Sequence, residues 1–150
     1  MLRHPRRGRG CPAVPDPYRE VMRQRTAVAA VAAGGALGAT ARFGVGHLIP
    51  WQPPDFPWAT ALVNVSGCLL IGVVLGWLLA SSGQPAWLRP FVATGVLGGY
   101  TTFSAFAAES VVLVDSGAVW TAVVYVASSV VLGLLAVRVG ARAVQRLRGA

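Results

Sequence analysis

Residues 95 to 109, GVLGGYTTFSAFAAE, place flexible and polar groups inside a segment that is otherwise apolar enough to cross a membrane. Gly98 and Gly99 each disfavour regular helix by about 1 kcal/mol relative to alanine. Neighbouring hydroxyls compete for backbone hydrogen bonds, and they belong to Thr101, Thr102 and Ser104. We therefore predict a mid-membrane break in a spanning helix. Because lipid cannot satisfy freed backbone groups, such a break must be buried in protein or line a polar cavity.

Two aromatic rings and a carboxylate follow the predicted break. Phe103 and Phe106 are three residues apart, so they share one helical face, and Glu109 lies one turn further. An aromatic ring has a positive edge and a negative face, so an edge-on ring can attract an anion. The same spacing is also typical of phenylalanines that simply pack in a helical core.

A second polar stripe lies in the apolar segment 59–80, where Thr60 and Asn64 are one turn apart and Gly67 or Cys68 continues the stripe. An asparagine is costly in lipid and should face protein. One interpretation is that it bonds a neighbouring helix, which stabilises by about 0.6 to 2 kcal/mol. Its amide can equally serve as a neutral N–H donor beside a passing anion.

Three further residues have both a structural and a functional interpretation. Arg42, near the end of an otherwise uncharged span, either extends to the lipid headgroups or faces a water-filled cavity. Tyr125 and Ser129 are four residues apart, with Ser128 beside them. They either form hydrogen bonds between helices or contribute to a polar pathway.

The composition is that of a membrane protein with one compact domain, since 55% of the 150 residues are hydrophobic and 12% are charged. We predict an all-α protein with four transmembrane helices, at residues 26–48, 59–80, 89–114 and 118–140. Gly34 and Gly38 form a small-xxx-small pattern that permits close helix packing. Residues 1–25 are predicted to be a disordered basic tail, followed by a transmembrane domain over 26–150. Met22 is an alternative translation start.

All 13 basic residues are arginine, and the net charge is +8. Seven arginines precede the first span and four lie at the end of the last, where they are expected to fix topology and meet anionic lipid rather than nucleic acid. Arg89 lies at the second loop, whereas the first and third loops have none. Both termini are therefore predicted to be cytoplasmic.

Catalytic and metal-binding constellations are not apparent. His4 and His47 are isolated, and neither Cys11 nor Cys68 has neighbours at metal-ligand spacing. We therefore predict that the protein is not an enzyme.

The string GVLGGYTTFSAF resembles the third-helix signature of the Fluc/CrcB fluoride channels. ATARF, around Arg42, and ALVNVSG, around Asn64, are similar to the family's first-helix and second-helix patterns. The resemblance implies an antiparallel dimer of four-helix subunits in the cell membrane that exports fluoride passively through two pores. The implied fluoride pathway comprises Asn64, Phe103, Phe106, Thr60, Ser104, Tyr125 and Ser129.

The resemblance also implies a vestibule beside Arg42, in which we include Glu109. A structural sodium ion is implied at the dimer interface, held by the main-chain oxygens of Gly98 and Thr101 from both subunits. Gly133 stands where the family often has another hydroxyl, which is a departure from the pattern.

The strong charge bias conflicts with a homodimer that inserts both ways up, so two assemblies stay open. One is a heterodimer with an oppositely oriented paralogue, and the other is a homodimer whose bias is overridden during insertion. Two other functions are alternatives. A small proton-coupled multidrug-type exporter needs a carboxylate in the first helix, which has none. A purely structural role in membrane assembly would give no function to Asn64 and the phenylalanine pair.

Overall fold

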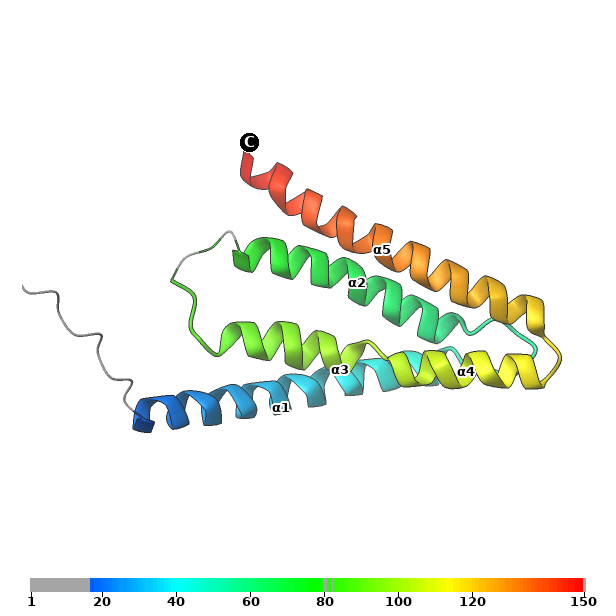
Figure 1. Ribbon diagram of the computed structural model, residues 1–150, viewed down its shortest axis with the longest axis horizontal. Helices are drawn as coiled ribbons and strands as arrows, with labels where there is room; N and C mark the ends of the chain where they lie inside the picture. Colours follow the sequence, from blue (N-terminus) through cyan, green and yellow to red (C-terminus); the bar gives the residue numbers. More distant parts are fainter. Residues whose placement is uncertain (1–16, 80, 82, 150) are drawn as a thin grey trace, which may run out of the picture.

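The computed structural model describes residues 17–79, 81 and 83–149. Its elements are α1 (Pro17–Leu48), α2 (Trp58–Leu79), the π-helix η1 (Pro90–Leu97), α3 (Gly98–Tyr100), α4 (Phe103–Asp115) and α5 (Val119–Gly149) (Figure 1). Four stretches of the described chain are long and apolar enough to span a membrane, and the third runs from Pro90 to Asp115 through η1, α3 and α4. The predicted all-α architecture with four membrane-spanning segments is confirmed.

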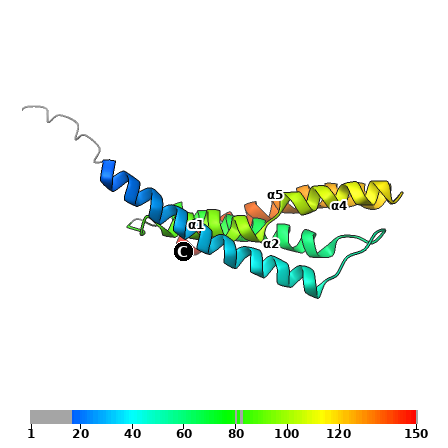
Figure 2. The ribbon, with the colours of Figure 1, turned by 90° about the horizontal axis from the view of Figure 1, so that it is seen from below.

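The spans pack as two pairs (Figures 1 and 2). The first pair is α1 with η1 and α3, the second is α2 with α5, and glycines line both contacts. In the first pair, a Cβ on Gly34 would collide with the carbonyl of Phe91, and a Cβ on Gly38 with that of Val96. This confirms the close packing that the small-xxx-small pattern predicts. In the second pair, Gly72 and Gly140 let α2 and α5 approach until their backbones nearly touch.

The two helices of each pair are parallel, because the numbers of the contacting residues rise together. The starts of α1 and η1 and the ends of α2 and α5 therefore lie at one end of the molecule, and the links before α2 and α5 lie at the other (Figure 1). At that other end, the side chains of Leu113, Ala122 and Tyr125 form a buried cluster, with Trp51 and Phe56 of the first link packed against it.

Two predicted boundaries need correction. Helix α1 begins at Pro17, so the prediction of a disordered tail is wrong for residues 17–25, and residues 1–16 lie outside the described part of the chain. Helix α5 continues beyond residue 140 to Gly149 and carries the last arginines. Charged helix ends of this kind lack the apolar pattern that marks a span, so hydropathy underestimates the length of the helix.

The third span changes conformation at two threonines. Thr101 and Thr102 are extended, with ψ of 157° and 124°, and α4 begins after them with the Thr102 hydroxyl accepting a bond from the Ala105 N–H at 3.2 Å. Gly98 and Gly99 are helical, so the conformational change falls on the threonines of the predicted stretch and not on its glycine pair. A Cβ on Gly99 would collide with the carbonyl of Gly35, which indicates that Gly99 serves packing against α1.

Candidate functional site

Asn64 joins α2 to the extended residues of the third span. Its Nδ2 donates to the Thr102 carbonyl at 2.9 Å, and its Oδ1 accepts from the Thr102 N–H at 2.8 Å. In a continuing helix that N–H would donate to the carbonyl of Gly98. The side chain thus satisfies both main-chain groups of Thr102 and keeps one N–H for another acceptor.

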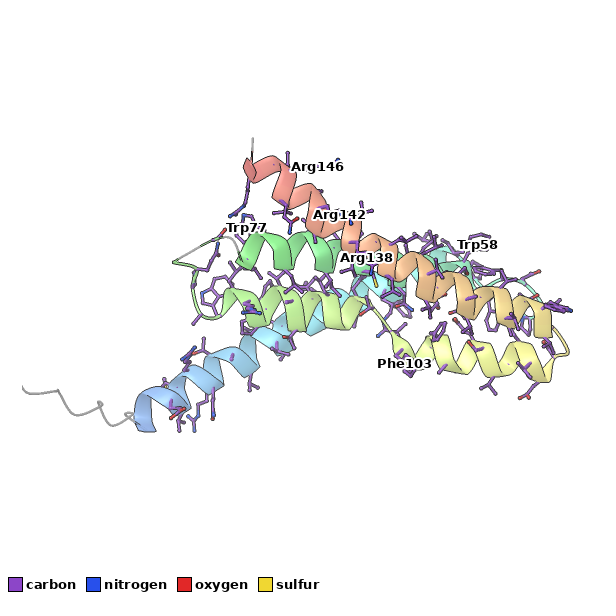
Figure 3. The ribbon with its side chains drawn as sticks, turned by 45° about the horizontal axis from the view of Figure 1, so that its top comes forward. Trp58, Trp77, Phe103, Arg138, Arg142 and Arg146 are labelled. Carbon is purple, nitrogen blue, oxygen red and sulfur yellow. The ribbon has the colours of Figure 1, made fainter. Side chains whose placement is uncertain are left out.

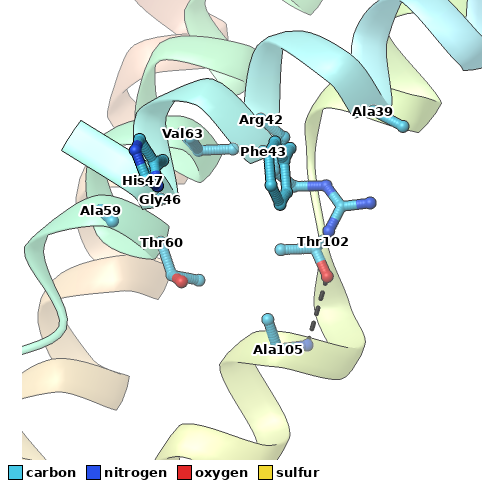
Figure 4. A pocket seen from close by; sticks show the side chains of 10 residues that line it. All are labelled: Ala39, Arg42, Phe43, Gly46, His47, Ala59, Thr60, Val63, Thr102 and Ala105. Carbon is cyan, nitrogen blue, oxygen red and sulfur yellow. Dashed lines mark hydrogen bonds between the residues drawn. The ribbon is translucent and has the colours of Figure 1, made fainter. Parts of the chain in front are cut away.

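Arg42 caps the end of α3 from the neighbouring helix. Its Nε donates to the Gly99 carbonyl at 3.1 Å, where the last carbonyls of a helix carry partial negative charge. The guanidinium lies in a cleft of about 560 Å³, which we call the arginine cleft (Figure 4). The lining residues are Ala39, Arg42, Phe43, Gly46, His47, Ala59, Thr60, Val63, Thr102 and Ala105. The structure thus places Arg42 at a cavity, with most of its donors available.

Glu109 connects three helices through its carboxylate. Oε1 accepts from the Thr60 hydroxyl and Oε2 from the Tyr125 hydroxyl, both at 2.7 Å. The Tyr125 side chain is fully buried, and its ring lies 5.2 Å from that of Phe106, measured between centroids. Thr60 and Tyr125, expected as donors to an anion, therefore direct their hydroxyl hydrogens to Glu109 in this conformation.

A second cleft, of about 310 Å³, brings together four of the predicted pathway residues. We call it the phenylalanine cleft, and its lining residues are Asn64, Cys68, Ile71, Thr101, Thr102, Phe103, Phe106, Ser129 and Val130. The two phenylalanine rings lie 6.0 Å apart between centroids. The Ser129 Oγ is buried and has no hydrogen-bond partner within the described residues. This hydroxyl is therefore a donor without an acceptor.

The remaining predicted residues lie at the edge of this arrangement. The hydroxyl of Ser104 is 3.2 Å from that of Thr102, and neither cleft is lined by Ser104. The Thr101 hydroxyl donates to the Leu97 carbonyl at 2.9 Å. Gly98 is exposed, and a Cβ there would meet no described atom within 4 Å. Gly133 is buried, and a Cβ on Gly133 would lie 3.4 Å from Cys68 Sγ.

Sequence reasoning missed the central position of Thr102. This residue lines both clefts, begins α4 and binds Asn64 through its backbone. A threonine just before a helical segment is a common N-cap, which was the available signal. His47, judged isolated, lines the arginine cleft. Its place there depends on how α1 ends beside α2 and α4, which spacing along the chain does not show.

Residues 29–141 match the family described as CrcB-like protein, Camphor Resistance (CrcB). The chain belongs to this family. A CrcB-like relative from Paracoccus denitrificans, named fluoride-specific ion channel FluC, is 49% identical over 110 residues, which are 73% of this chain and 87% of the relative. A relative of the same name from Novosphingobium aromaticivorans is 47% identical over 118 residues, covering 77% and 93% respectively. The resemblance stated from the sequence is confirmed, and the family's curated names describe a channel and not an enzyme.

Proposed function

We propose that this protein is a fluoride-specific ion channel that lets fluoride leave the cytoplasm passively. Support comes from the curated relatives, which are named as such channels. The matched residues, 29–141, include both clefts. The single structural observation that carries the proposal is that two clefts, lined by a cation, neutral donors and aromatic rings, share Thr102.

The arginine cleft is proposed to receive the ion. A fixed positive charge in a cleft with low-dielectric walls raises the local concentration of anions, and Arg42 supplies that charge. Fluoride holds its water tightly, so the next step must replace water with donors. The second N–H of Asn64 and the unpartnered hydroxyl of Ser129 are suited to this, with the positive ring edges of Phe103 and Phe106 as further contacts.

Thr60, Tyr125 and Ser104 belong to the proposed pathway as rotatable donors. A hydroxyl can turn its hydrogen from one acceptor to another without moving its oxygen. Thr60 and Tyr125 would turn from Glu109 to a passing ion and back again. Glu109 would hold these hydroxyls in place between ions.

The working unit is proposed to be an antiparallel dimer. Phe103 is 80% exposed on this single chain, and the phenylalanine cleft contains polar groups that lipid cannot satisfy. A second subunit that covers this face would close the cleft into a pore. Two such pores follow from a two-fold axis.

A structural sodium ion is proposed at the same interface. The helix ends before Thr102, so the Gly98 carbonyl lacks the N–H that a continuing helix would provide, and Gly98 faces open space. Main-chain oxygens suit hard cations. The carbonyls of Gly98 and Thr101 from both subunits would hold the ion, whose charge would balance these dipoles between the subunits.

The charge distribution supports a cell-membrane protein with both termini in the cytoplasm. Every arginine except Arg42 lies before residue 26, at the end of α5 or at the second loop, and such bias orients spans. A dimer with opposed subunits then needs either a paralogue of reversed bias or insertion that overrides the bias. We favour the paralogue.

The test is anion efflux from liposomes that contain the purified dimer, followed with a fluoride electrode and a chloride electrode. We expect fluoride release driven by its gradient alone, with chloride slower by orders of magnitude. Phe106→Ile, which keeps apolar bulk but removes the ring edge, should slow fluoride release, whereas Val130→Ile on the same cleft should not. Equal release of both halides, or proton-dependent export of organic cations, would contradict the proposal.

A further inference from the structure

The last turns of α5 present a stripe of arginines to the outside of the bundle (Figure 3). Arg138, Arg142 and Arg146 follow one another at intervals of four residues, so they share one helical face. All three are exposed, and the described residues include no ion-pair or hydrogen-bond partner for them. The neighbouring Arg148 is different, because its Nη2 donates to the Ser81 hydroxyl at 2.6 Å.

The register between α5 and α2 gives the depth of this stripe. Gly72 contacts Val137 and Ala141, and Gly76 contacts Val144. Trp58 and Trp77 mark the two ends of α2, about 28 Å apart at the helical rise, which matches a hydrocarbon core of about 30 Å. Arg146 is then level with Trp77, and the backbones of Arg142 and Arg138 lie about 6 Å and about 12 Å deeper.

An exposed arginine at that depth needs an anion within reach. A charged side chain in hydrocarbon is costly unless it extends to the interface and pairs there. On the same face, the preceding turns carry Val131 and Leu134, which are 54% and 61% exposed. The face therefore changes from apolar to cationic toward the level of Trp77, in the order in which a phospholipid changes from acyl chain to phosphate, and the arginine side chains extend toward that level.

From this match we propose that Arg138, Arg142 and Arg146 form a binding site for an anionic phospholipid. The lipid phosphate lies between the guanidinium groups, which bind phosphate oxygens with paired N–H donors. Its acyl chains lie along Val131 and Leu134. An anionic lipid is favoured over a zwitterionic one because several positive charges face one phosphate, and each contributes about five-fold in affinity near the surface.

The test compares lipids retained by the full chain after extraction from vesicles of equal parts phosphatidylglycerol and phosphatidylcholine, counted by mass spectrometry. The wild type should retain phosphatidylglycerol at least five-fold over phosphatidylcholine. Arg138→Gln with Arg142→Gln should bring the ratio close to one. The matched control, Arg23→Gln with Arg25→Gln, removes the same charge from exposed positions of α1 and should leave the ratio nearly unchanged.

A second double variant, Arg138→Lys with Arg142→Lys, keeps the charge. It distinguishes loss of charge in the Gln variant from misfolding of that variant. It should retain most of the preference. Equal retention of both lipids by the wild type would overturn the site, as would equal losses in the test and control pairs. Dissociation of the dimer by the Gln pair at an unchanged lipid ratio would also overturn it, since the stripe would then pair with a partner subunit's carboxylates.

Discussion

Asn64 holds α2 to the point where the third span changes conformation, through two hydrogen bonds to the backbone of Thr102. In Asn64→Asp, the donor to the Thr102 carbonyl becomes an acceptor, and a negative charge stands in the phenylalanine cleft, where like charges repel strongly at low dielectric. We expect fluoride efflux from liposomes to fall at least ten-fold. Ser110→Ala is the control, since the Ser110 hydroxyl donates to its own helix at the Phe106 carbonyl. Normal efflux from a dimeric Asn64→Asp protein would remove Asn64 from the pathway.

Glu109 is the acceptor for two hydroxyls from two different helices. Glu109→Ala leaves the fully buried Tyr125 hydroxyl without its partner, which costs about 1–3 kcal/mol. Because Tyr125→Phe removes the same bond from its other end, the double variant should be less destabilised than the sum of the two single variants. Thermal unfolding in detergent should give a coupling of about 0.5–3 kcal/mol. Additive effects would show that this hydrogen bond contributes no stability.

At the scale of elements, the glycine contacts decide how closely α1 approaches the third span. A Cβ on Gly38 would collide with backbone at Val96 and Tyr100, and overpacking of this kind typically costs about 1–3 kcal/mol. We expect Gly38→Ala to lower the unfolding temperature and the yield of monodisperse protein. Gly44→Ala, in open space on the same helix, should be neutral or stabilise by up to about 1 kcal/mol. If both variants unfold alike, the packing contact is not what stabilises this pair.

At the scale of the whole molecule, the single orientation that the arginine distribution favours conflicts with a dimer of oppositely oriented copies. Cysteines introduced in the C-terminal tail of the chain expressed alone should be labelled only from the cytoplasm, because the arginines lie on that side. Cysteines in the 116–118 link should be labelled only from outside. On our proposal the lone chain then conducts little fluoride until an oppositely biased paralogue is supplied. Tails labelled equally from both sides, together with full fluoride flux, would instead establish a homodimer.

Sequence alone determined the four spans and the polar stretch of the third, because long apolar runs and their interruptions are local properties of the chain. It also selected Asn64, Phe103, Phe106 and Ser129, which the structure gathers around one cleft. The family patterns around Arg42 and Asn64 were short and local as well. Residue type and spacing were sufficient for these.

Partner choice was decided only by the tertiary structure. Thr60 and Tyr125 were predicted as donors to an anion, yet both donate to Glu109, which approaches them on a third helix. The conformational change falls on Thr101 and Thr102 because Asn64, 38 residues away, satisfies the Thr102 backbone, while packing against α1 keeps Gly99 helical. Periodicity places residues on a helical face, but it cannot say which other helix satisfies a polar group there, since that depends on contacts between distant segments.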